Sequence, residues 1–218
     1  MTLQQYQQLV QDIKGCKNCD LCEEGVIDGL DPHVPPQGSL DASVVFVAQN
    51  PGEFEVRQQQ PLTSTGKSGK VYDKCLATLG LTREQVWTSN IVLCHSPGNR
   101  EPVPYECLKC KGFLERQLQL IRPKLVVSFG RLVGQSLLSD FKMTRDHGKL
   151  KHSDVYGVEV FPLFHPAYVG CYAKASDREA FKRDLATLKR YLNGSTGFTG
   201  TKFEPKPPQF EAGNTLGV

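Results

Sequence analysis

The stretch YECLKCKGFLERQLQLIRPKLVVSF, residues 105–129, decides the fold class. Its first part places apolar residues such as Leu114 and Leu118 along one helical stripe, and Pro123 ends that pattern. The mostly apolar run that follows, Lys124–Phe129, is typical of a strand covered on both faces. A helix followed by such a strand is the repeating unit of a parallel α/β sheet.

The same alternation extends in both directions along the chain. Strands are expected at Ser43–Val47, Val86–Leu93, Lys124–Phe129 and Val158–Phe164. Helices are expected at Gly69–Leu79, Tyr105–Ile121, Arg131–Leu138 and Ser176–Leu192. The sequence therefore predicts an α/β fold, a three-layer α/β/α sandwich around a mainly parallel four-stranded sheet.

Length and composition indicate one ordinary globular domain. The 218 residues are 39% hydrophobic and 22% charged, with a formal net charge of +3 that is too small to indicate a nucleic-acid partner by itself. No apolar run approaches the ~20 residues of a membrane span, and the N-terminus lacks a secretion signal, so we expect an intracellular, cytoplasmic protein. Residues 1–192 are expected to form the domain and residues 193–218 a flexible tail.

Closely spaced cysteines without a secretion signal indicate a metal site. Cys16 and Cys19 form a C-x-x-C pair, and fifteen residues separate Cys94 from Cys110. Four thiolates from these two regions suit an iron–sulfur cluster or a structural zinc, and spacing does not separate the two. A zinc site using Cys107 with Cys110 is a further arrangement that the spacing permits.

Several blocks occur between Cys16 and about Tyr191 in a characteristic order. They read CKNCDL, VVFVAQNPG, TSNIVLC, PGNREPVPYECLKCKGFLERQLQLIRPKLVVSFGR and FHPAY. Together they resemble the uracil-DNA glycosylase superfamily, specifically its iron–sulfur family 4. The resemblance implies a [4Fe–4S] cluster rather than zinc, with ligands at Cys16, Cys19, Cys94 and Cys110. It leaves Cys22 and Cys107 as non-ligands.

The segment Ala48–Gly52 corresponds, by this resemblance, to the loop that positions the attacking water. Gln49 stands where family 4 has a carboxylate, and Asn50 is similar to the water-orienting Asn of mismatch-specific relatives. Neither amide can act as a general base, so we expect water to be oriented rather than deprotonated. The reaction should then be slower than with a carboxylate at this position. Taken alone, AQNPG also fits a polar turn after a strand.

The resemblance assigns two further residues to the base. Asn90 is expected to hydrogen-bond uracil N3–H and O4, since an amide offers both an acceptor and a donor. His165 is expected to donate a hydrogen bond to O2 as negative charge builds there, and a neutral imidazole suffices for that.

The base-stacking position departs from family 4. That family has a Phe where this chain has Leu62, and Phe54 is a candidate substitute. Gly52 is expected to lie against the base with them. Lys67, Lys70 and Arg100 are expected to contact DNA phosphates.

Tyr168 lies in a segment expected to press into the minor groove where the base was. The partner expected is DNA with a flipped uracil or related base, bound by a monomer and without any membrane.

The expected activity is hydrolysis of the N-glycosidic bond of uracil, or of a related deaminated base, in DNA. Gln49 and Leu62 leave a second interpretation open, a DNA-binding or base-modifying member of the same fold that has lost or changed uracil hydrolysis. A third is a zinc-stabilised α/β module without a nucleic-acid role.

Overall fold

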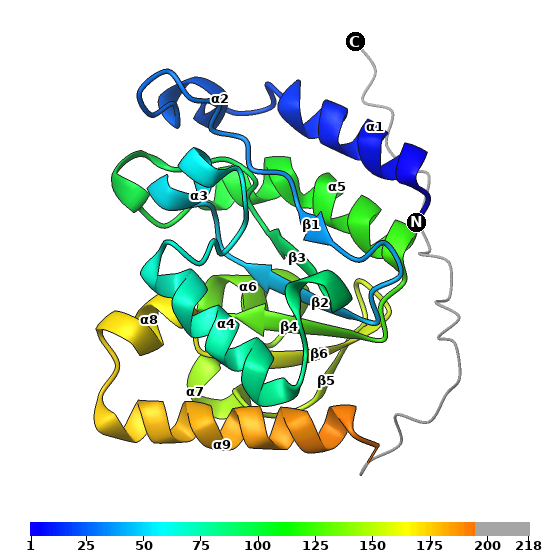
Figure 1. Ribbon diagram of the computed structural model, residues 1–218, viewed down its shortest axis with the longest axis vertical. Coiled ribbons are helices and arrows are strands. Elements are labelled where there is room, and N and C mark those ends of the chain that lie inside the picture. The colour runs from blue at the N-terminus through cyan, green and yellow to red at the C-terminus, as the bar shows by residue number, and fades with distance from the viewer. Residues whose placement is uncertain (195–218) are drawn as a thin grey trace.

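The computed structural model describes residues 1–194, and the tail predicted from Asn193 lies outside this range except for its first two residues. Within it, one twisted sheet is enclosed by helices on both faces (Figure 1). The strands are β1 (Gln37–Gly38), β2 (Val44–Ala48), β3 (Trp87–Asn90), β4 (Leu125–Phe129), β5 (Lys151–Ser153) and β6 (Val158–Leu163).

The sheet has six strands in the order β1-β3-β2-β4-β6-β5. The four central strands, β3, β2, β4 and β6, are mutually parallel, which confirms the predicted parallel core. The two edge strands β1 and β5 pair antiparallel and correct the expected number of strands. They were missed because two or three residues are too short to carry a hydrophobic pattern.

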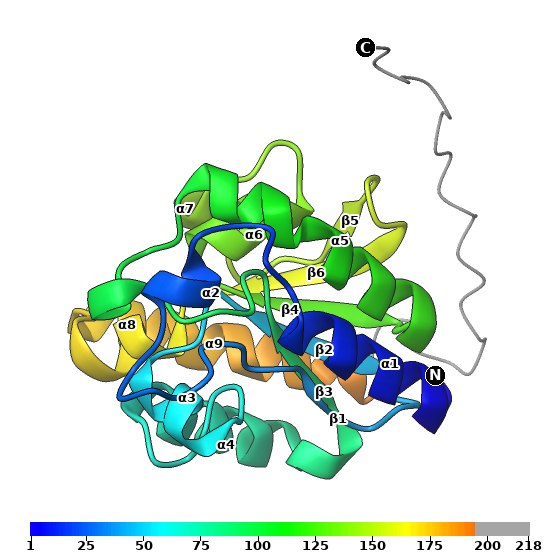
Figure 2. The same cartoon turned by 90° about the horizontal axis from the view of Figure 1, so that it is seen from above.

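Helices cover both faces of this sheet, as Figure 2 shows from above. They are α1 (Leu3–Lys14), α2 (Leu21–Glu24), α3 (Glu53–Gln58), α4 (Lys67–Leu79), α5 (Pro104–Ile121), α6 (Arg131–Leu137), α7 (Met143–Asp146), α8 (Pro166–Cys171) and α9 (Ala175–Leu192), with short 3₁₀ turns at Arg83–Gln85 and Pro97–Asn99. No helix in residues 1–194 is long and apolar enough to cross a membrane.

The core is divided by the sheet into two layers. Val45 and Val47 of β2 pack with α5 and α6, whereas Val44 and Phe46 of the same strand pack with α4 and α9. Every residue of β2 is buried, because both of its faces are covered. The three-layer α/β/α prediction is therefore confirmed.

The N-terminal segment is attached to the outside of this sandwich. Leu9 and Ile13 of α1 are fully buried against Leu93 and the side chain of Phe113 on α5. This contact brings the chain that follows α1, with its cysteines, beside α5 and the end of β3 (Figure 1).

Candidate active site and cysteine pocket

The predicted site residues follow the carboxyl ends of neighbouring parallel strands. Gln49 and Asn50 come directly after β2, Asn90 ends β3, and His165 comes two residues after the end of β6. Ala48 is paired in register with Asn90, so the water loop begins beside the expected base-binding amide. Ligands bind at this edge of open α/β sheets, and the structure thus brings these predicted residues to one such edge.

The two amides of the water loop are both held by the segment after Cys94. Asn50 Nδ2 donates to Ser96 Oγ at 3.3 Å, and Gln49 Nε2 donates to Glu101 Oε1 at 2.7 Å. Ser96 is fully buried. Sequence reasoning missed Ser96 and Glu101, because contacts between distant loops leave no periodic signal.

The loop itself is fixed at Gly52. Its N–H donates to Glu55 Oε2 at 2.8 Å, and a Cβ at this position would lie only 2.8 Å from that same oxygen and 3.2 Å from Asn99 Oδ1. Burial raises the pKa of Glu55. A side chain at position 52 would therefore displace the Glu55 carboxylate that accepts from the Gly52 N–H.

Asn90 is buried, with 2% of its surface exposed, and its Nδ2 has no hydrogen-bond partner in the described part of the chain. Only His95 Nε2 and Ser128 Oγ share this property among the described side chains. A buried donor without a partner is costly, so a ligand acceptor at Asn90 would relieve a penalty that the free protein carries.

His165 caps α8, and its Nδ1 accepts a hydrogen bond from the Ala167 backbone N–H at 3.1 Å. The neutral ring therefore carries its proton on Nε2. Burial lowers the pKa of His165 to about 4, so the ring is neutral near pH 7. Gly130 lies against it, because a Cβ there would be 3.1 Å from His165 Cβ.

The two candidates for base stacking differ in exposure. Leu62 is 2% exposed, and its side chain belongs to the core layer of α4 and α9. Phe54 is 55% exposed and lies beside Gly66, at the start of α4. Only Phe54 thus has a free aromatic face.

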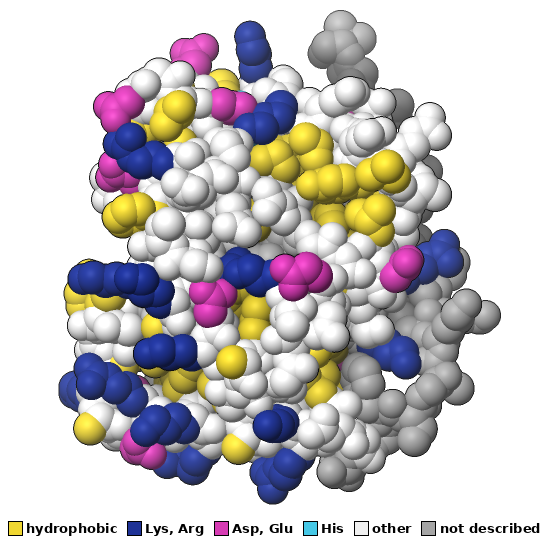
Figure 3. Space-filling model, in the orientation of Figure 1, with side chains coloured by type: hydrophobic (Ala, Val, Ile, Leu, Met, Phe, Trp, Pro, Cys, Tyr) yellow, Lys and Arg dark blue, Asp and Glu magenta, His cyan; other side chains and the backbone are white. Residues whose placement is uncertain are grey.

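The predicted DNA contacts divide into free and engaged side chains. Lys67 and Lys70 lie in the first turn of α4, and Lys70 is exposed. Arg100 instead forms hydrogen bonds of 2.9 and 2.6 Å with Glu106, and Tyr168 donates to Asp177. Figure 3 shows Lys and Arg side chains gathered over the part of this face where α4, α8 and α9 lie.

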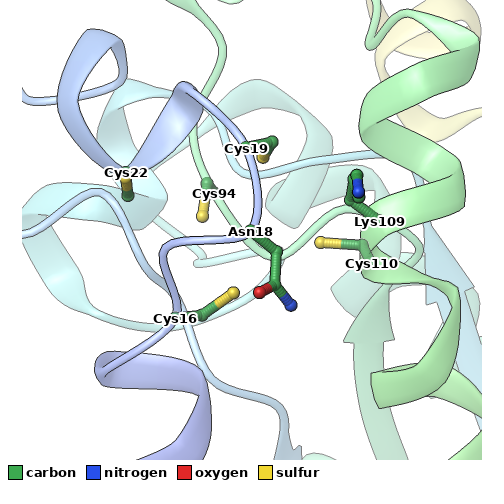
Figure 4. Close-up of a pocket in the computed structure, with 7 residues that line it drawn as sticks. All are labelled: Cys16, Asn18, Cys19, Cys22, Cys94, Lys109 and Cys110. Atoms are coloured by element: carbon green, nitrogen blue, oxygen red, sulfur yellow. The ribbon is translucent and has the colours of Figure 1, made fainter. Parts of the chain in front are cut away.

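Five cysteines line one apolar pocket between the N-terminal segment, the chain after β3 and α5. Its lining is Cys16, Asn18, Cys19, Cys22, Cys94, Lys109 and Cys110. In Figure 4 the sulfur atoms of Cys16, Cys19, Cys94 and Cys110 surround a common space, while Cys22 lies to one side. Cys107 does not line the pocket. The pocket lining thus includes the four cysteines that the resemblance implies, together with Cys22.

The thiols of this pocket influence one another. Burial raises the pKa of Cys110 to about 12 and also raises that of Cys94, and the neighbouring cysteines raise both further. With pKa values raised in this way, the thiols lose their protons only when a nearby cation stabilises the thiolates. This fits a pocket that binds metal through sulfur. No three His, Cys, Asp or Glu side chains within residues 1–194 are arranged to hold a single metal ion.

Comparisons with known proteins identify a family and several relatives that this chain resembles. The model of the uracil DNA glycosylase superfamily matches residues 35–189. A type-4 uracil-DNA glycosylase of Archaeoglobus fulgidus is 34% identical, with 83% of this chain and 89% of the relative covered. A type-4 uracil-DNA glycosylase of Saccharolobus solfataricus is 31% identical, covering 85% of each chain. One from Thermotoga maritima is 30% identical, covering 72% of this chain and 81% of the relative.

Proposed function

This chain belongs to the uracil-DNA glycosylase superfamily, and from that membership we propose that it excises uracil from DNA by hydrolysing the N-glycosidic bond. Water adds to C1′ of the sugar, and the bonding electron pair leaves with uracil, which then takes up the proton that the water releases. The products are free uracil and an abasic site, the first intermediate of base-excision repair. One observation carries the proposal. Asn90, the water loop and His165 lie at the same edge of the sheet, and among the described residues the buried Asn90 Nδ2 has no hydrogen-bond partner.

The base reaches this edge only when it is flipped out of the duplex. Asn90 Nδ2, which has no partner in the described residues, donates to uracil O4, and Asn90 Oδ1 accepts from N3–H. Phe54 stacks on the base with its exposed face, and Leu62 supports the site from the core. These contacts offset the few kcal/mol that unstacking costs.

The water is oriented by amide oxygens. Asn50 Nδ2 is tied to Ser96, so Asn50 Oδ1 remains to accept a hydrogen bond from water. Gln49, at the place of the family 4 carboxylate, lies beside it. An amide takes up no proton near neutral pH, and hydrolysis therefore depends on the stability of the departing base.

His165 stabilises the departing base. Its Nε2–H donates to uracil O2, where negative charge grows as the bond breaks. Because the ring is already neutral, this donor is present at physiological pH without any proton uptake.

We propose that the cysteine pocket holds a [4Fe–4S] cluster through Cys16, Cys19, Cys94 and Cys110. A single zinc ion would need every sulfur at about 2.3 Å from one point, whereas a cubane gives each cysteine its own iron. The resemblance to the iron–sulfur family 4 favours the cluster over zinc. When bound, the cluster joins the N-terminal segment to α5 and to the chain after β3, and its role is structural.

DNA is the macromolecular partner of this family, and Lys67 and Lys70 are the side chains we propose for its phosphates. Arg100 can contact a DNA phosphate only if the phosphate displaces Glu106 from the guanidinium. Tyr168, on α8, is the residue we propose for the minor groove. The expected monomer stays a prediction. None of the eight cysteines forms a disulfide in the described residues, which supports a reducing compartment such as the cytoplasm.

The proposal is tested with oligonucleotides that contain a single uracil, single-stranded or opposite adenine or guanine. Incubation followed by alkali should cut the strand at the uracil and nowhere else. Strands without uracil are the control. If uracil DNA is bound but not cut in any context, the chain is a binding or base-modifying member of the fold, an interpretation that Gln49 favours.

A further inference from the structure

Gln49 is held from outside the water loop by a carboxylate that is itself held. Its Nε2 donates to Glu101 Oε1 at 2.7 Å. Arg131, the first residue of α6, donates through Nη2 to both Glu101 oxygens, at 3.1 and 3.0 Å. Arg131 Nη1 donates to Gln135 Oε1 at 2.8 Å, which fixes the guanidinium along α6. The chain Gln49–Glu101–Arg131 thus joins three segments that are distant in sequence.

The chemistry of this chain determines which end of the Gln49 amide is free. A carboxylate beside arginine only accepts hydrogen bonds, so it selects the NH₂ end of the amide. Gln49 Oε1 is then left without a partner in the described part of the chain. Asn50 follows the same pattern, since its Nδ2 donates to Ser96 Oγ. Residues 96–101 therefore hold both amide nitrogens and leave both oxygens free.

We infer that Glu101 is a positioning residue, which turns Gln49 Oε1 toward the attacking water. The inference rests on the proposed glycosylase function. An amide whose two ends were interchangeable would present a donor to the water half of the time and an acceptor the other half. A fixed acceptor is what a water needs when its lone pair must face C1′.

The position of Arg131 connects this device to the leaving-group side. Gly130, which precedes it, lies against His165 with only 3.1 Å available to a Cβ. Arg131 and the packing surface of His165 are therefore adjacent in the chain. One short segment after β4 supports both the residue that orients Gln49 and the residue that meets the base.

The arrangement is suited to mutation because it adds little to stability. The side chains of Arg131 and Glu101 are 54% and 49% exposed, and exposed ion pairs contribute little to folding. Variants at position 101 should therefore fold normally, so that losses of activity report on the site.

The test exchanges the two partners. Glu101→Gln lets either amide donate, so the orientation is lost, and single-turnover excision of uracil should slow about tenfold with little change in KM. Gln49→Glu puts two carboxylates together, which raises the pKa of one of them and should make excision depend on pH between about 5 and 7. The double variant restores one donor and one acceptor and also places a carboxylate beside the water, so we expect its rate to equal or exceed the wild-type rate.

Glu159→Gln is the matched control, since this half-buried residue pairs with His152 at the far end of β6. It should leave excision unchanged. The inference is overturned if Glu101→Gln is fully active, if its loss follows a lowered melting temperature, or if the double variant is no faster than the slower single variant. A wild-type protein that releases no uracil overturns the proposed function instead, and the inference with it.

Discussion

At the scale of single residues, the protonation of His165 is the feature that the environment controls most strongly. The Ala167 N–H occupies Nδ1, and burial holds the pKa of the ring near 4. A neutral ring should serve at every pH above that value. The pH profile of excision should therefore show no histidine step near 6.5, the ordinary pKa, and should fall only as the pH approaches about 4.

The same shift affects stability with a definite sign. The unfolded chain binds a proton at His165 below about pH 6.5, and the folded chain does not until about pH 4, so acid favours unfolding across this window. His165→Gln removes this titration. The melting temperature of the wild type should therefore fall more steeply between these pH values than that of the variant. Parallel curves would contradict the shifted pKa.

Asn90 offers a second test in which function and stability should move differently. Asn90→Ala removes the hydrogen bonds to the base, and kcat/KM should fall about 10- to 100-fold. Stability should hold or rise, because the variant also removes a buried donor without a partner in the described residues. Ser128→Ala is the control, since it removes another such group and should leave excision intact. Unfolding of Asn90→Ala in milder denaturant would indicate a structural role instead.

The sequence was sufficient for residues that carry their own motif and insufficient for their partners. Asn50, Asn90 and His165 lie at the end of strands, where strand and helix patterns already locate them. Glu101 and Ser96 lie in an irregular loop, and only the packing of that loop against the water loop reveals their role. Hydrogen bonds between loops depend on tertiary structure, which periodicity does not encode.

At the scale of elements, the two candidates for stacking on the base lie on α3 and in the segment after it, and their side chains have different environments. Phe54, on α3, is exposed, and Leu62 is in the core. Phe54→Ala should raise KM about 5- to 100-fold through lost stacking and should leave the melting temperature unchanged. Leu62→Ala should instead lower the free energy of unfolding by about 2–5 kcal/mol.

The contrast between these two variants is the measurement that matters. Titration of uracil DNA and thermal unfolding are performed on both proteins. Phe54→Leu keeps apolar bulk but not the aromatic face, and should bind nearly as weakly as Phe54→Ala. If Phe54→Ala binds and cleaves like the wild type, the stacking residue must be sought elsewhere.

Element boundaries show where sequence patterns end. The strand predicted to reach Leu93 stops at Asn90, because Leu93 turns to pack against Leu9 of α1 and is apolar for that reason. The last helix begins at Ala175, one residue before its predicted start. The long amphipathic α5 ends at Ile121 as expected, since Pro123 follows.

At the scale of the whole molecule, the cysteine pocket joins segments that the sheet does not connect. Cys16 and Cys19 lie between α1 and α2, Cys94 follows β3, and Cys110 is on α5. Two residues after Cys94 comes Ser96, which holds Asn50. A cluster in this pocket would therefore stabilise the loop that carries Ser96 and Glu101, although neither residue lines the pocket.

The last prediction concerns the four proposed cluster ligands, and variants of Cys22 and Cys107 are its controls. Single Ser variants at Cys16, Cys19, Cys94 and Cys110 should lose iron and visible absorption after anaerobic purification, because serine does not replace a thiolate ligand. Cys22→Ser and Cys107→Ser should keep both, since one thiol lies to the side of the common space and the other outside the pocket.

The four ligand variants should also excise uracil more slowly, because a loosened chain after Cys94 no longer holds the nitrogens of Gln49 and Asn50. If Cys22→Ser loses iron and Cys16→Ser retains it, the ligands must be reassigned. A colourless, zinc-loaded wild-type protein would exclude the cluster.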